Sequence, residues 1–97
     1  MITSRYEIVT DYIYVKRVNS LAITSVDPLD STMVEIEGVA AEMFLGLVEL
    51  RLSTSEVVQM VQSNYQVEAE VIEKDLEDLI KFLLEKKIIK AKLPSAE

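Results

Sequence analysis

The chain has 97 residues, of which 49% are hydrophobic and 28% are charged, with two Gly and two Pro. This composition fits one small folded domain and excludes a disordered or low-complexity chain. The net charge of −7 disfavours nucleic acid and anionic membrane as partners, because like charges repel. The absence of Cys and His excludes disulfides, thiolate or imidazole metal sites, and catalysis by either side chain.

The ends of the sequence carry no targeting pattern that we recognise. Residues 1–7 lack the basic and then apolar build of a signal peptide, and no apolar run reaches the roughly 18 to 20 residues of a membrane span. We therefore expect a soluble cytoplasmic protein with no membrane partner. We expect a single domain over residues 1–97, with its core at about residues 12–90 and a frayed tail at residues 91–97.

Two β-strands are predicted near the N-terminus. Residues 12–18 are rich in aromatic and β-branched side chains, and Asn19 and Ser20 follow as a turn signal. Residues 21–26 alternate between apolar and polar side chains. This period places Leu21 and Ile23 on the inner face and leaves the orientation of Val26 open.

A third strand is predicted over residues 32–37, after a turn at residues 27–31 that contains Pro28. A period of two places Val34 and Ile36 on one face of this strand. Its other face carries Met33, Glu35 and Glu37. Three short strands joined by tight turns indicate a small antiparallel sheet.

From Gly38 onward the spacing of apolar residues becomes helical, and it predicts three helices. The first covers about residues 38–50. Ser53 and Glu56 form a capping box that begins the second, and residues 64–67 end it. The third runs from about residue 68 to residue 87, with acidic side chains at its start and lysines at its end, as the helix dipole favours. The fold class is therefore α+β, with a winged-helix-like order of three strands and three helices.

The third helix has distinct faces. A rotation of about 100° per residue predicts one core stripe. Its members are Ile72, Leu76, Leu79 and Leu83. One flank of the stripe carries Val71, Asp75, Asp78 and Phe82, and the opposite flank carries Ile80 and Leu84, which we expect to pack on the other helices. The sequence leaves open which flank faces the third strand.

The ordered set of patterns over about residues 12–90 resembles the PqqD family, whose fold is also called the RiPP recognition element. The matching segments are Val34 to Glu37 for the strand, Ala40 to Phe44 for the first helix, Ser53 to Val57 for the cap, Tyr65 to Val67 for the break, Asp75 to Leu83 for the last helix, and Ile88 and Ile89 for its apolar exit. Four departures indicate a divergent member. Glu37 stands for the family's Asn, Phe44 for its Trp, Val48 and Glu49 for its Asp-Gly turn, and Lys87 for its helix-ending Gly.

The resemblance implies a peptide-binding protein without a cofactor. Such proteins bind the leader of a ribosomally made precursor peptide and present it to a modifying enzyme, a radical-SAM maturase or a leader peptidase. The leader adds as a strand beside the third strand and lies next to the last helix. The peptide-binding residues that this implies are Met33, Val34, Glu35, Ile36, Glu37, Val71, Asp75, Asp78 and Phe82.

Other functions fit the residues less well. A winged-helix transcription factor should have a basic recognition helix, whereas residues 68–78 carry six acidic side chains against Lys74 alone. An adaptor for a folded protein partner remains open, and an open strand edge also permits homodimerisation. We predict no enzymatic activity and no catalytic residue, because the chain is too small to enclose a substrate pocket. We also predict no metal site, since the acidic cluster lacks a defined binding loop.

Overall fold

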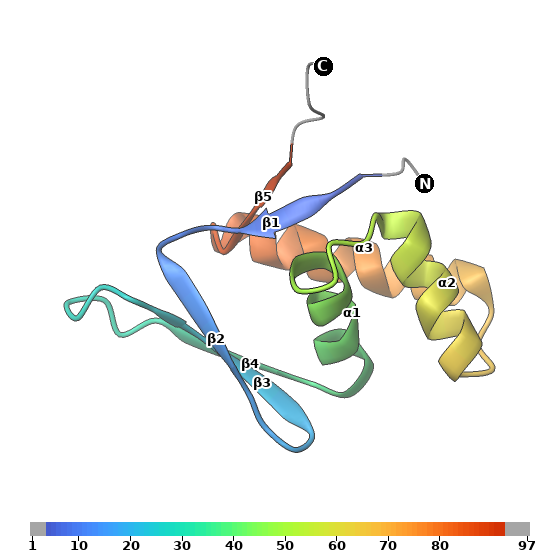
Figure 1. The fold of residues 1–97 in the computed structure, drawn as a ribbon, viewed down its shortest axis with the longest axis horizontal. Helices are drawn as coiled ribbons and strands as arrows, with labels where there is room; N and C mark the ends of the chain where they lie inside the picture. The colour runs from blue at the N-terminus through green and yellow to red at the C-terminus, as the bar shows by residue number, and fades with distance from the viewer. Residues whose placement is uncertain (1–3, 93–97) are drawn as a thin grey trace.

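The computed structural model describes residues 4–92, so residues 93–97 of the tail predicted at residues 91–97 lie outside the described residues. The elements, in chain order, are β1 (Tyr6–Ile8), β2 (Tyr12–Lys16), β3 (Ser20–Ser25), β4 (Met33–Glu37), α1 (Gly38–Val48), α2 (Thr54–Asn64), α3 (Ala69–Glu85) and β5 (Ile89–Ala91). Strands β2, β3 and β4 form an antiparallel sheet in that order, and β1 pairs with β5 in a separate ribbon. The predicted α+β class, with a three-stranded antiparallel sheet followed by three helices, is confirmed. Figure 1 shows the sheet on one side of α1 and α2 on the other.

The central strand β3 is buried on both faces over part of its length. Leu21 and Ile23 face the helices, as their spacing predicted. Ala22 is also buried, although it points to the opposite face, because its methyl group is small and lies between Val15 of β2 and Glu35 of β4. Val26 lies beyond the end of β3 and is exposed, so it is not part of the inner face.

Strand β4 passes into α1 without a loop. Gly38 is the first residue of α1 and has a φ of 59°. Glycine adopts this left-handed conformation at little cost because it has no Cβ. A Cβ built on Gly38 would meet no atom within 4 Å, so the conformation rather than space favours glycine here. The tight junction holds β4 beside α1, which contacts both strand β4 and helix α3.

The ends of α2 and α3 are stabilised by local hydrogen bonds. The capping box at α2 is confirmed, with the Ser53 side chain accepting from the Glu56 N–H and the Glu56 side chain accepting from the Ser53 N–H. At the end of α3, the Lys87 N–H donates to Leu84 O and the Ile88 N–H donates to Leu83 O. These two bonds form a Schellman motif, which requires a left-handed residue. Lys87 takes that place, with a φ of 60°.

The ribbon of β1 and β5 extends the fold beyond both ends of the core predicted at about residues 12–90. The strand pattern near the N-terminus indicated nothing before residue 12, yet Tyr6–Ile8 forms β1. Ala91 pairs with Tyr6, and the Lys92 N–H donates to Arg5 O, so residues 91 and 92 are tied to the fold and the frayed end does not begin at residue 91. A strand of three residues is too short to give a clear period, and its position depends on a partner far along the chain.

Helix α3 buries most of its predicted stripe, with one exchange. Ile72, Leu76 and Leu83 are fully buried, but Leu79 is only half-buried and Ile80 takes its place in the core. The β1 side of the molecule explains this shift, because Tyr6 and Thr54 lie on the flank of α3 that carries Ile80. The buried side chains of the sheet, the helices and β5 form one hydrophobic cluster.

Candidate functional site

The free edge of the sheet is β4, and its hydrogen-bond register decides which backbone groups are available there. The Gly38 N–H donates to Asn19 O at 3.3 Å, directly after β4. In an antiparallel ladder, hydrogen-bonded pairs alternate with pairs that make no bond to each other. Val34 and Ile36 lie four and two residues before Gly38, so their N–H and C=O groups are bonded to β3.

The groups directed away from β3 belong to the alternate residues. The Ser25 N–H donates to Thr32 O at 3.3 Å, which gives the same alternation from the other end of the strand. The backbone N–H groups of Met33, Glu35 and Glu37 therefore point to the open side. The carbonyl groups of Met33 and Glu35 point there too, whereas Glu37 is the N-cap of α1. Within residues 4–92, no other strand pairs with this side of β4.

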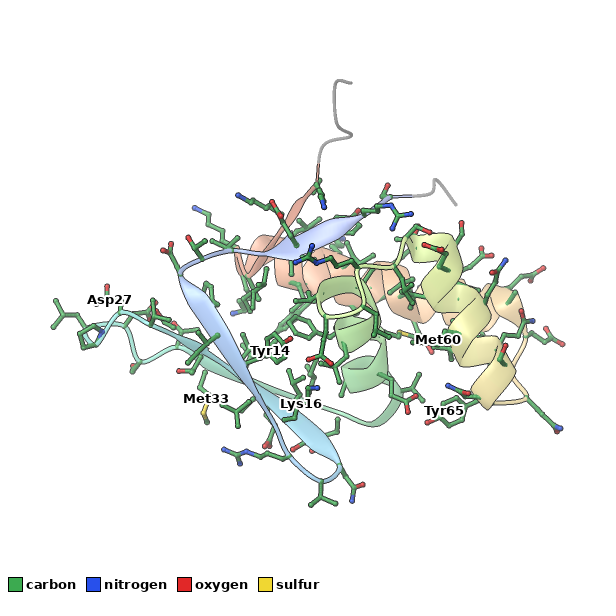
Figure 2. The ribbon with its side chains drawn as sticks, in the orientation of Figure 1. Tyr14, Lys16, Asp27, Met33, Met60 and Tyr65 are labelled. Atoms are coloured by element: carbon green, nitrogen blue, oxygen red, sulfur yellow. The ribbon has the colours of Figure 1, made fainter. Side chains whose placement is uncertain are left out.

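The side chains of β4 follow the predicted alternation. Val34 and Ile36 face the helices, Ile36 being buried and Val34 half-buried. Met33 is exposed and points away from the helices (Figure 2). Glu35 lies on the same outer face, where its carboxylate is 3.6 Å from the Arg17 guanidinium. The Glu35 side chain therefore interacts within the sheet.

The predicted flank of α3 is exposed as a whole. Val71 and Phe82 are 50% and 38% exposed, and Asp75 and Asp78 are exposed between them. The Asp78 carboxylate is 3.5 Å from the Lys74 ammonium, an exposed pair that contributes little to stability. The flank therefore presents two apolar and two acidic side chains to a ligand.

Helix α1 contacts both β4 and α3, the two elements that carry the candidate site. Helical geometry places the flank on the side of α3 opposite Ile80, and Ile80 faces Tyr6 of β1. The flank with Phe82 is therefore turned away from the ribbon of β1 and β5. Leu79 was assigned to the core, but it is half-buried and lies one turn from both Asp75 and Phe82. The spacing of Leu79 from Asp75 and Phe82, four and three residues, could have predicted from the sequence that Leu79 borders the flank.

The other edge of the sheet, β2, is held against α1 by side chains. The Tyr14 hydroxyl donates to Glu49 Oε1 at 3.1 Å, and Lys16 Nζ donates to Glu49 Oε2 at 2.7 Å. Tyr14 also packs edge-on against Phe44, with ring centroids 5.5 Å apart. The hydrogen bond from Lys16 holds the pKa of Glu49 below its ordinary value of 4.5, while burial and the bond to Glu49 raise the pKa of Tyr14. Figure 2 shows Tyr14 and Lys16 beside α1.

The described part of the chain has neither a metal-binding cluster nor a membrane-spanning helix. Among residues 4–92, no grouping of three or more His, Cys, Asp or Glu side chains could hold a metal ion. None of the helices in this part of the chain is both long and apolar enough to cross a bilayer.

Comparison with known proteins gives the family. The family model described as coenzyme PQQ synthesis protein D (PqqD) matches residues 25–89. The chain belongs to the PqqD family. The matched residues include β4 and all three helices, so the PqqD family pattern contains both parts of the candidate site.

One solved structure shares the fold across nearly the whole chain. It is described as TbiB1 in complex with the TbiA(beta) leader peptide, with a TM-score of 0.79 and 17% sequence identity. The similarity covers 91% of this chain and 99% of that chain. None of the curated proteins compared with the chain matches it in sequence. The resemblance to PqqD and the RiPP recognition element that the sequence predicted is confirmed.

Proposed function

We propose that this protein binds the leader segment of a ribosomally synthesised precursor peptide by strand addition to β4 and presents it to a modifying enzyme. The observation that carries this proposal is the row of backbone N–H groups on Met33, Glu35 and Glu37, which point away from β3 and face no other strand within residues 4–92. An extended peptide can bond to such groups whatever its sequence, and pockets beside the strand then select its side chains. The protein acts as a binding protein and not as a catalyst.

The second support is the chemistry of the α3 flank. Val71 and Phe82 offer apolar contacts, and Asp75 and Asp78 offer negative charge. A peptide with apolar anchors and a basic side chain matches this surface. Duplex DNA does not, because the two carboxylates would face phosphates.

Family and fold support the same ligand class. Members of the PqqD family act as peptide chaperones, and the structural neighbour TbiB1 is described in complex with a leader peptide. We propose a radical-SAM maturase or a leader peptidase as the enzyme that receives the bound peptide. A second copy of the chain could pair with β4 in the absence of peptide, because an open strand edge can bond to any extended backbone, whatever its sequence.

Leader binding predicts a short reading frame beside this gene that encodes the precursor peptide, and the test uses that peptide, with affinity measured by calorimetry. Replacing Glu35 by Pro removes one N–H on the open side and should weaken binding about tenfold or more. The sheet should survive, because this N–H makes no bond to β3. We expect the wild-type protein to bind the peptide in a 1:1 complex.

Two controls isolate the backbone group. Glu35→Ala removes the same carboxylate and its contact with Arg17 but keeps the N–H, so it should bind within about twofold of the wild type. Lys16→Pro removes an N–H from the open side of β2 and should also bind within about twofold. Normal binding by Glu35→Pro, with the fold intact by circular dichroism, would exclude strand addition at β4.

A further inference from the structure

A cleft of about 580 Å³ lies between the end of the sheet where β2 begins and β3 ends, with the turn before β4, and the segment where α3 ends and β5 begins. One wall carries Asp11 and, from the turn before β4, Asp27 and Asp30. The other wall, at the end of α3 and the start of β5, carries Lys86, Lys87 and Lys90. Figure 2 places Asp27 at the tip of the turn between β3 and β4. The cleft therefore has an acidic wall and a basic wall.

The two walls do not neutralise each other. Within residues 4–92, no ion pair crosses the cleft, and Lys90 pairs instead with Glu7 at 3.6 Å. The ammonium group of Lys86 lies 5.9 Å from the centre of the Phe82 ring, and no carboxylate in the described chain pairs with Lys86 or Lys87. The basic wall thus has two lysines without an anionic partner in a protein whose net charge is −7.

The acidic wall is fixed by its own turn. The backbone N–H of Leu29 donates to Asp27 and that of Thr32 donates to Asp30, each at 2.9 Å. The hydrogen bond from the Thr32 hydroxyl also holds the pKa of Asp30 below its ordinary value of 3.8. Asp30 therefore stays negatively charged near neutral pH, and its position is set by the turn.

We propose that this cleft binds the part of the precursor peptide that adjoins the added strand, through an acidic side chain facing Lys86 and Lys87 and a neighbouring basic side chain facing Asp27 and Asp30. Successive side chains of an extended segment point in opposite directions, so one such segment can reach both walls. This inference rests on the proposed function, because Asp27 and Asp30 belong to the turn that leads into β4.

The cleft also gives the bound peptide a direction. Backbone pairing alone allows a strand to add in either orientation. Along α3, the exposed acids Asp75 and Asp78 lie before Phe82 and the free lysines lie after it. A peptide that carries an acidic residue at one end of its strand is attracted to the lysine end and repelled from the other end. Charge therefore selects one orientation.

The test reverses one charge in the cleft and one outside it. Lys86→Glu should weaken binding of the peptide from the neighbouring reading frame about tenfold, since an attraction becomes a repulsion. Lys81→Glu makes the same change on the same helix, away from this cleft, and should change affinity by about twofold or less. The effect of Lys86→Glu should shrink in about 0.5 M salt, where exposed charges are screened.

A charge swap identifies the partner residue in the peptide. Replacing one acidic residue of the peptide by Lys should restore affinity for Lys86→Glu and weaken affinity for the wild type. If Lys86→Glu binds like Lys81→Glu while Glu35→Pro still loses binding, the cleft proposal is wrong and strand addition stands. If Glu35→Pro binds normally, strand addition is wrong and the cleft as its continuation is wrong with it.

Discussion

The two edges of the central sheet have similar backbones but different surroundings. At β2, Tyr14 and Lys16 are both hydrogen-bonded to Glu49 at the end of α1. At β4, the Glu35 carboxylate contacts Arg17 and Ser20, which belong to the β2–β3 hairpin region. The β2 edge is therefore linked to a helix by side chains, and within residues 4–92 Glu35 makes no such link from the β4 edge.

On the proposed function, this difference would favour β4 over β2 as the edge that takes the peptide strand. Within residues 4–92, β2 and β4 are each bonded only to β3, so both have backbone groups on their outer side. An exposed edge is a general liability, and a protein that uses one edge benefits from restricting the other. In this protein Tyr14 and Lys16 link β2 to the end of α1, and the flank of α3 is the surface that we propose recognises the side chains of the peptide.

The largest expected effect is a loss of stability when proline replaces a residue of β4 whose N–H is bonded to β3. Val34→Pro removes an N–H that is bonded to β3, so it should lower the free energy of unfolding by about 2 to 4 kcal/mol. Glu35→Pro, one residue away, should cost far less because its N–H faces outward. Urea denaturation of both variants measures the difference. Equal losses of stability would show that the deduced alternation of β4 is wrong.

A smaller effect, on peptide affinity, should differ between substitutions on the two flanks of α3. Phe82 and Leu84 are 38% and 41% exposed, so truncating either removes a similar half-exposed apolar side chain. Phe82→Ala should weaken peptide binding about tenfold, as expected for an aromatic anchor, whereas Leu84→Ala should leave affinity within about twofold. Fluorescence anisotropy with a labelled peptide measures both. A larger loss for Leu84→Ala would place the peptide on the flank that faces β1.

The smallest effect concerns the link that holds β2 to α1. The pKa of Glu49 is lowered by the Lys16 hydrogen bond, so the folded state binds this proton less readily than the unfolded state. The stabilisation is present above the ordinary pKa of 4.5 and is lost as the pH falls through the lower folded value. Thermal unfolding of the wild type should therefore show an acid-induced loss of stability that is smaller in Glu49→Gln. Identical pH profiles would mean that the Glu49 contact does not contribute.

The site was predictable in part from single elements. The alternation in residues 33–37 and the exposed flank with Val71 and Phe82 follow from local periods of two and 3.6, and the structure has both. The exchange of Leu79 for Ile80 in the core was missed, because it depends on the ribbon of β1 and β5. That ribbon joins residues about 85 positions apart, such as Tyr6 and Ala91, and local spacing carries no information about such a pairing.

The sequence by itself determined the element types, the capping box of α2 and the faces of each strand and helix, because these depend on neighbouring side chains and backbone dihedral preferences. Only the tertiary structure decided which N–H groups of β4 are free, which flank of α3 is turned away from β1, and that Asp30 and Lys86 line one cleft. These features arise from packing between segments far apart in the chain. Contacts between such segments stabilise the fold only once the helices and strands have packed around the common core.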